Sequence, residues 1–125
     1  MSPKIVLEKS TSKEKAGIEY WSIFSDGKRA GKVFIELVAD KSLGAASNAK
    51  SDGKVAKIQI FLNKQSQGKG IGSAAYGKAC ELSRHKVIYA NMRKTNTASI
   101  KAACNAGFVE RVIPGDRQVT MVWKR

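Results

Sequence analysis

The sequence predicts an α/β or α+β domain built on a mixed sheet, and three observations lead to this prediction. Strand-like segments come first and flank an Asp26-Gly27 turn. The second half then alternates strand, helix, strand, helix and strand. The 125 residues, of which 42% are hydrophobic and 26% charged, suit one globular domain over residues 1–125. We therefore expect a mixed sheet whose middle contains a βαβ unit.

The first half of the chain carries the strand signals. Its strand-like segments are rich in β-branched and aromatic side chains, and Asp26-Gly27 supplies the positive φ angles of a tight hairpin turn. A longer loop that extends to Gly31 is the alternative. The predicted strands span residues 5–8, 19–25 and 32–38.

A long connection and then the alternating pattern make up the rest. Residues 39–53 are small and polar, which predicts a mobile connection of the kind that often serves as a lid. Gly107 stands where a left-handed helix end is expected. The predicted strands are 54–62, 86–90 and 118–123, and the predicted helices are 71–83 and 97–105.

The two cysteines, Cys80 and Cys104, fall inside predicted helices without a Cys/His cluster beside them. We expect two buried small hydrophobic side chains and no metal site. On the hairpin, Trp21, Phe24 and Phe34 are predicted as core side chains in preference to a base-stacking platform.

No segment predicts membrane insertion or secretion. The apolar runs at residues 33–35 and 60–62 are far shorter than the roughly 20 residues of a membrane span. Residues 1–9 lack the apolar stretch of a secretory signal. We expect a cytoplasmic protein with no membrane partner, and monomer and homodimer both fit the sequence.

The charge predicts an anionic partner. The formal net charge is +13, and residues 53–109 hold ten Lys or Arg against one acid, Glu81. A basic cleft concentrates anionic ligands. A phosphate-rich cofactor, a nucleic acid and an acidic protein surface all satisfy this charge, and a basic surface that only aids solubility is a further interpretation.

A glycine-rich turn lies between a predicted strand and a predicted helix. Glycines let several backbone amides approach one anion, and the helix that follows adds the positive end of its dipole. This combination favours a pyrophosphate site, although a turn that binds nothing is the alternative. The turn consists of Gln67, Gly68, Lys69, Gly70, Ile71, Gly72 and Ser73.

Two common phosphate-binding motifs do not fit this turn. A P-loop needs Gly, four residues, Gly, Lys and then Ser or Thr, and no such string occurs. The dinucleotide fingerprint needs a third glycine where Ser73 stands, and no acid ends the strand at 86–90.

The turn resembles a different family. Gln67, Gly70 and Gly72 match the Q/R-x-x-G-x-G/A signature of the GNAT superfamily of acetyl-coenzyme A dependent N-acetyltransferases. A second resemblance follows on the helix after the next strand, where the family has N-x-x-(A/S)-I and then G-F. The residues that match are Asn96, Ser99, Ile100, Gly107 and Phe108.

The resemblance implies a GNAT-like mixed, mostly antiparallel sheet with a central splayed strand pair and two flanking helices. The strands at 54–62 and 86–90 would splay and admit the pantetheine arm of acetyl-coenzyme A, the co-substrate. Backbone groups at Phe61 and Leu62 would bind that arm and the acyl carbonyl. Residues 67–73 would hold the pyrophosphate, with Asn96 and Ser99 towards the pantetheine or thiol end.

The implied reaction is direct attack of an amine on the thioester, driven by orientation and by amide donors aimed at the developing oxyanion. Many relatives carry a Tyr four residues before the G-F glycine as proton donor, and this chain has Ala103 there. Candidate substitutes are Ser99, Tyr89 and Cys104.

The general base and the acceptor side also differ from the family pattern. Lys57 and Gln59 occupy the strand where relatives often place a carboxylate, so Glu36 is the first candidate base and Asp40 the second. Residues 9–17 leave no room for the pair of helices that usually covers the acceptor site. We expect an open acceptor side.

Three functions fit these observations. The first is an N-acetyltransferase that acts on a protein, peptide or small amine. The second is a phage-type relative that modifies a DNA base, favoured by the charge and the open face. The third is a non-catalytic coenzyme A binding module, favoured by the missing Tyr.

Overall fold

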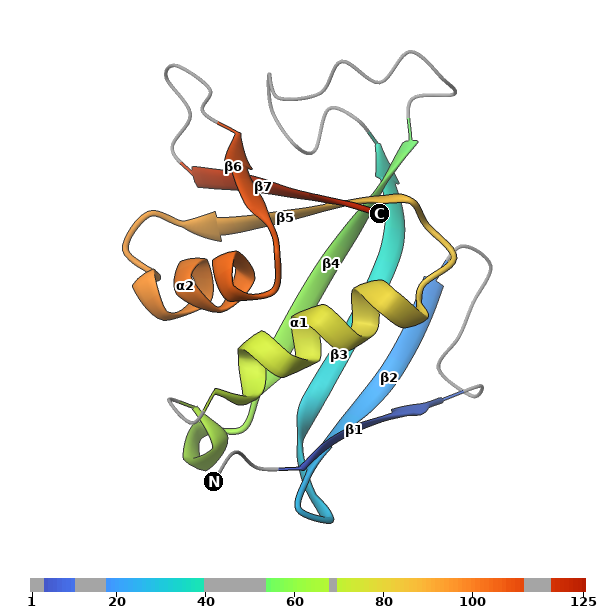
Figure 1. The fold of residues 1–125 in the computed structure, drawn as a ribbon, viewed down its shortest axis with the longest axis vertical. Coiled ribbons are helices and arrows are strands. Elements are labelled where there is room, and N and C mark those ends of the chain that lie inside the picture. The colour runs from blue at the N-terminus through green and yellow to red at the C-terminus, as the bar shows by residue number, and fades with distance from the viewer. Residues whose placement is uncertain (1–3, 11–17, 40–53, 68–69, 112–117) are drawn as a thin grey trace.

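The computed structural model of the chain describes residues 4–10, 18–39, 54–67, 70–111 and 118–125. Within them, one seven-stranded sheet is accompanied by two α-helices, which confirms the predicted α+β class (Figure 1). The helices are α1 (Ile71–Leu82) and α2 (Thr97–Asn105), and a short 3₁₀ turn, η2 (Lys64–Ser66), precedes α1. The strands are β1 (Ile5–Lys9), β2 (Ile18–Ser25), β3 (Lys28–Ala39), β4 (Lys54–Leu62), β5 (Val87–Arg93), β6 (Val109–Arg111) and β7 (Gln118–Lys124).

The sheet is mixed, with the order β1-β2-β3-β4-β5-β7-β6. The β4–β5 pair is parallel and the other neighbouring strands are antiparallel. Helix α1 connects β4 to β5, so the expected βαβ unit lies at the centre of the sheet.

The two parallel strands separate soon after they meet. They share only two residue pairs, Ala56 with Ile88 and Lys57 with Tyr89. Beyond these pairs β4 continues along β3, and β5 continues along β7. Figure 1 shows β4 and β5 diverging from their point of contact. The predicted splayed pair is therefore present, and it interrupts the sheet ladder at its centre.

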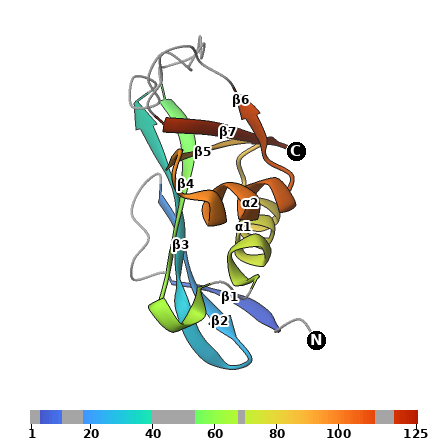
Figure 2. The same cartoon turned by 90° about the vertical axis from the view of Figure 1, so that its left-hand side faces the viewer.

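Both helices pack on the same side of the sheet (Figure 2). Alternate residues of a strand point to opposite faces, and those that face the helices form the core. Trp21 is one of these buried residues, which confirms its prediction as a core side chain. The buried strand residues include Trp21, Ile23, Val33, Ile35, Ile58, Ile88 and Met121, and α1 contributes Ile71, Ala75, Tyr76, Ala79 and Cys80.

The opposite face of the sheet carries a row of aromatic side chains. The Tyr20 and Phe34 rings are nearly parallel with centroids 6.2 Å apart, and the Phe34 and Phe61 centroids are 6.0 Å apart. Phe34 is half-buried, so its prediction as a core residue is wrong. Among the described residues, no helix covers this face (Figure 2), in agreement with the expected reduction of acceptor-side helices. We call it the uncovered face.

The first hairpin has the tight turn and not the longer loop. Asp26 and Gly27 both have positive φ, 51° and 82°, as a two-residue hairpin turn requires. Gly31 lies within β3, next to a bulge in its pairing with β2. A Cβ at Gly31 would collide with the carbonyl oxygen of Phe61, so this position requires glycine for close strand approach.

Other local predictions are corrected by the structure. Strand β5 runs to Arg93, three residues further than predicted, because its later residues pair with β7. The three-residue strand β6 was not predicted, since it is too short to show a period. Cys80 is buried as expected, whereas Cys104 is exposed. The predicted connection began at residue 39, but Ala39 ends β3; the rest of it, residues 40–53 with Asp40, lies outside the described residues.

Candidate functional site

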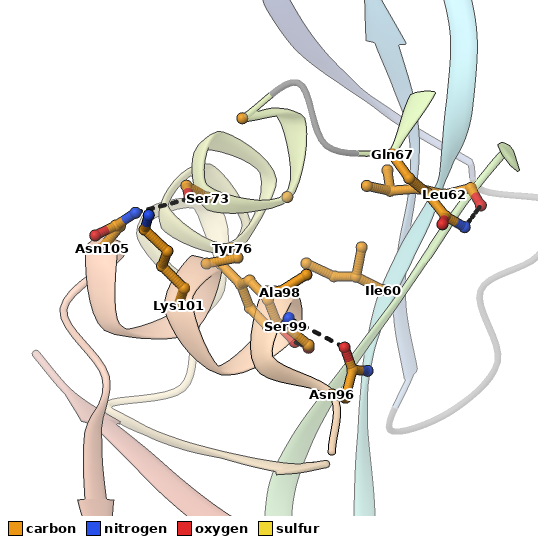
Figure 3. Close-up of a pocket in the computed structure, with 13 residues that line it drawn as sticks. Ile60, Leu62, Gln67, Ser73, Tyr76, Asn96, Ala98, Ser99, Lys101 and Asn105 are labelled. Carbon is orange, nitrogen blue, oxygen red and sulfur yellow. Dashed lines mark hydrogen bonds between the residues drawn. The ribbon is translucent and has the colours of Figure 1, made fainter. Parts of the chain in front are cut away.

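A cavity of about 540 Å³ opens between α1, α2 and the end of β4 (Figure 3). It lies on the helix side of the sheet, where the splay of β4 from β5 leaves room between the two halves. Six of its thirteen lining residues belong to the two sequence motifs. The lining residues are Ile60, Leu62, Gln67, Gly70, Gly72, Ser73, Tyr76, Asn96, Ala98, Ser99, Lys101, Ala102 and Asn105.

The N-terminus of α1 forms one end of this cavity. Gly70 is the N-cap in a left-handed conformation, with φ 78°, and no side chain caps the first turn. The first-turn amides of a 12-residue helix therefore present the positive end of its dipole beside Gly72 and Ser73. No acidic residue lies in that turn. This end of the cavity is suited to an anion.

The predicted residues of the glycine turn divide into three groups. Gln67, Gly70, Gly72 and Ser73 line the cavity, and their role in pyrophosphate binding stays a prediction. The side chain of Ile71 is buried in the core, so only its backbone is available to a ligand. Gly68 and Lys69 lie outside the described residues.

Side chains tie the cavity wall together at two places. Gln67 Nε2 donates to the carbonyl oxygen of Leu62 at 3.4 Å and joins the turn to the end of β4. Asn105 Nδ2 donates to Ser73 Oγ at 3.4 Å and joins α2 to α1 (Figure 3). The mouth is therefore built from β4, α1 and α2 together.

Helix α2 presents its start and one face to the cavity. Asn96 is the N-cap, and its Oδ1 accepts from the backbone N–H of Ser99 at 3.2 Å. At the other end, Gly107 has φ 101°, and the Phe108 N–H donates to the Ala103 carbonyl at 3.0 Å. These bonds form a Schellman motif, so the predicted helix end at Gly107 is confirmed.

Tyr76 was not predicted as a site residue. Its hydroxyl lies 3.2 Å from Ser99 Oγ, and its ring meets the Phe108 ring edge-on with centroids 5.5 Å apart. Burial raises the pKa of the Tyr76 hydroxyl above its ordinary value, and the Ser99 hydrogen bond opposes this only in part. Tyr76 is therefore neutral at physiological pH.

Besides Ile60 of β4, the other lining residues that sequence reasoning missed share a helix face. Ala98, Lys101, Ala102 and Asn105 recur at spacings of three or four residues along α2. This period was a usable signal. It could not show which face of α2 turns towards α1.

Several predicted residues lie elsewhere. Phe61 lies on the uncovered face, 49% exposed with the Lys32 ammonium 5.3 Å from its ring centre, and does not line the cavity. Glu36 and Tyr89 are half-buried and also outside the lining. Glu36 accepts from Gln59 Nε2 at 3.3 Å. Of the candidate catalytic residues that the structure describes, it brings only Ser99 into the cavity.

Two absences were found within the described part of the chain. No group of three His, Cys, Asp or Glu side chains there is placed to hold a metal ion. None of the described helices is long and apolar enough to cross a membrane.

A family model described as the acetyltransferase (GNAT) family matches residues 3–108 of the chain. No protein of curated function matches the sequence significantly.

Solved structures share the fold. The GNAT domain of S. lividans PAT superposes with a TM-score of 0.67 at 16% identity, over 87% of this chain and 61% of that one. Aminoglycoside acetyltransferase AAC(6')-Ib, solved with coenzyme A and kanamycin, gives 0.65 at 21% identity, over 87% and 67%. The N-acetyltransferase PseH of Campylobacter jejuni gives 0.61 at 15% identity, over 89% and 70%. The chain therefore spans 61 to 70% of the length of these structures.

Proposed function

Because this chain belongs to the acetyltransferase (GNAT) family, we propose that it transfers an acetyl or related acyl group from acetyl-coenzyme A to an amine. The observation that carries the proposal is the position of the cavity. It runs from the uncapped N-terminus of α1 to the start of α2, along the part of β4 that no longer pairs with β5. A ligand with an anionic end and a long, narrow arm fits that arrangement.

The residues of the cavity support a coenzyme A thioester as the acyl donor. We propose that Gly70, Gly72 and Ser73 hold the pyrophosphate through backbone amides and the helix dipole. Lys101 lines the same cavity and adds a cation. The aminoglycoside acetyltransferase with the similar fold was solved with coenzyme A and with acetyl-coenzyme A.

The uncovered face supports approach of the amine from the side opposite the helices. Beyond Lys57 and Tyr89 the strands β4 and β5 no longer pair, so a nucleophile on the uncovered face would lie near a thioester held between the strands. Backbone groups at Phe61 and Leu62 remain the proposed partners of the acyl carbonyl. Amide donors aimed at a developing oxyanion are often the largest contribution to such a reaction.

Glu36 remains the proposed general base. It belongs to the alternate set of β3 residues that faces away from the helices, beside Gln59 of β4. An amine that approaches from this face would contact the carboxylate before it reaches the thioester. Tyr89 pairs with Lys57 at the last point of β4–β5 contact, and its proposed role as an acid is weakened because it does not line the cavity.

A second acceptor class is favoured by the charge. Residues 53–109 hold ten Lys or Arg against one acid, more than one coenzyme A needs. A large anionic partner, such as a nucleic acid or an acidic protein, could reach the uncovered face directly. Transfer to an amine on such a partner is therefore the alternative within the same activity.

Calorimetry with acetyl-coenzyme A and coenzyme A tests the proposal first. We expect micromolar affinity or better, and a ligand at about a hundred times its Kd should stabilise the fold by about 2.7 kcal/mol. Free thiol release should then be followed with polyamines, peptides and oligonucleotides as acceptors. No binding at millimolar ligand would contradict the proposal, and binding without transfer to any acceptor would indicate a non-catalytic module.

A further inference from the structure

Two hydroxyl groups from different helices meet inside the cavity. Tyr76 on α1 and Ser99 on α2 both line it, with Tyr76 Oη and Ser99 Oγ 3.2 Å apart. Tyr76 is only 6% exposed, whereas Ser99 is half-buried and more open to the cavity. The family resemblance already places Ser99 towards the thiol end, but the proposed donor and acceptor binding do not use Tyr76.

The packing around Tyr76 fixes its ring from three sides. Phe108 meets the ring edge-on at 5.5 Å. Ser99 and Ala103 lie one turn apart on α2, and Ala103 is completely buried. The small side chain of Ala103 leaves room at the interface between α1 and α2. The phenol ring at this interface is that of Tyr76, which belongs to α1. The hydroxyl is therefore held in one place.

We infer that the Tyr76–Ser99 pair stabilises the sulfur of the coenzyme A thioester as it leaves, with Tyr76 donating to Ser99 Oγ and Ser99 donating to the sulfur. This inference rests on the proposed acyl transfer. It assigns the leaving-group interaction to a residue of α1 and not to position 103 of α2.

The chemistry balances without a further reagent. The amine nitrogen forms a bond to the carbonyl carbon, the carbon–sulfur bond breaks, and its electron pair goes to sulfur. The amine gives one proton to Glu36, the proposed general base, which passes it to solvent, and the thiolate later takes one proton from solvent. The hydroxyl pair stays protonated throughout and supplies hydrogen bonds to the developing charge.

The environment suits this role. Burial keeps the pKa of Tyr76 above its ordinary value, so the phenol remains a donor throughout the neutral and mildly alkaline range. An ordinary thiol has a pKa of about 8.5, so a thiolate is a tolerable leaving group that hydrogen bonds can stabilise. The N-terminus of α2 adds the positive end of its dipole beside Ser99. None of the four residues that precede this helix is acidic.

The thiol pKa of bound coenzyme A tests the inference without any acceptor. The NMR shift of the methylene group beside the sulfur, in isotope-labelled coenzyme A, reports the titration in the full chain. A hydrogen bond donated to the thiolate stabilises its charged form. We therefore expect a thiol pKa about one unit lower in the wild type than in Tyr76→Phe, a tenfold effect. Ser99→Ala should give the same shift, and the double variant should match the single ones because the two hydroxyls act in series.

Tyr20→Phe is the matched control, because it removes a phenol hydroxyl on the uncovered face, outside the cavity lining. It should titrate like the wild type. Tyr76→Phe keeps the ring that packs on Phe108, and Ser99→Ala gives an independent readout if Tyr76→Phe folds poorly. Coenzyme A affinity, measured with the thiol protonated, should stay within about twofold in Tyr76→Phe and in the control.

The outcomes separate the two proposals. If the wild type does not bind coenzyme A, the proposed function fails and this inference fails with it. If coenzyme A binds and its thiol titrates at the same pH in the wild type and in either single variant, the relay is overturned and the proposed function stands.

Discussion

Gly72 in the first turn of α1 lies directly against Ala102 of α2. A Cβ added to Gly72 would come within 3.4 Å of the Ala102 Cβ and 3.8 Å of Leu62 Cδ1. The two helices therefore approach each other at two small residues, Gly72 and Ala102, in the wall of the cavity. A larger side chain at either position would occupy the cavity or force the helices apart.

Replacing Gly72 with a larger side chain should weaken coenzyme A binding. Gly72→Val adds a branched group that enters the space between Ala102 and Leu62, so we expect at least about tenfold lower affinity and a destabilisation of about 1–3 kcal/mol from overpacking. Gly72→Ala adds only the Cβ, which fits at the limit of contact. Calorimetry and thermal unfolding of both variants check this. Equal affinity for Gly72→Val and wild type would show that the ligand does not pass this wall.

Replacing Gly70 with Asp should abolish coenzyme A binding. The left-handed φ of 78° strains any residue with a Cβ by about 1–2 kcal/mol, and the carboxylate places a negative charge on the α1 amides. Gly70→Ala separates the two effects, because it keeps the strain without the charge. Gly77→Ala is the matched control, since a Cβ at Gly77 has open space and this residue does not line the cavity. Strong binding by Gly70→Asp would place the phosphates elsewhere.

The Ala103→Tyr exchange should not restore a proton donor. The family pattern alone predicts a faster reaction for this variant, but Ala103 has no exposed surface and packs in the core. A phenol there would overpack the α1–α2 interface, so we expect a loss of about 1–3 kcal/mol in unfolding free energy and no gain in kcat. Thermal unfolding and single-turnover rates on an identified acceptor test this. A faster, fully stable variant would show that α2 can present the hydroxyl to the thioester.

The two cysteines should differ sharply in thiol reactivity. Burial raises the pKa of Cys80 to about 12, the nearby Arg125 opposing this only in part, and the side chain is inaccessible. Cys104 is exposed on α2. We expect one thiol to react rapidly with a disulfide reagent in the native protein at neutral pH, and two after unfolding. Mass spectrometry of the labelled peptides identifies the site, and Cys104→Ser should remove the fast phase.

Nucleic acid binding at low salt tests the second acceptor class. The positive charge predicts sequence-independent association that collapses between about 50 and 200 mM salt, as counterion release requires. Arg93 and Lys94 are exposed at the end of β5, and replacing both with Ala should flatten the salt slope. Fluorescence anisotropy with duplex and single-stranded probes measures it. No association at the lower salt concentration would leave a protein or small-amine acceptor.

The sequence by itself predicted most of the elements and the turn proposed to bind an anion. Residues 67–73 carry their chemistry locally: glycines permit the turn, and the apolar period from Ile71 predicts the helix that follows. The end of α2 at Gly107 is equally local, because left-handed φ selects glycine. The resemblance to one family then supplied the splayed strands, which no local property of β4 or β5 predicts.

Only the tertiary structure decided which faces meet. The place of Tyr76 in the helical repeat is that of a core residue. Its hydroxyl lies beside Ser99 in the cavity because α2 packs against α1 there. Phe34 has the composition of a core strand, yet its side chain joins Tyr20 and Phe61 on the uncovered face. Cys104 belongs to a helix with one buried residue, Ala103, and turns to solvent. Such outcomes depend on the rotation of one element against another, which is set by packing between residues distant in the chain and leaves no mark in local sequence.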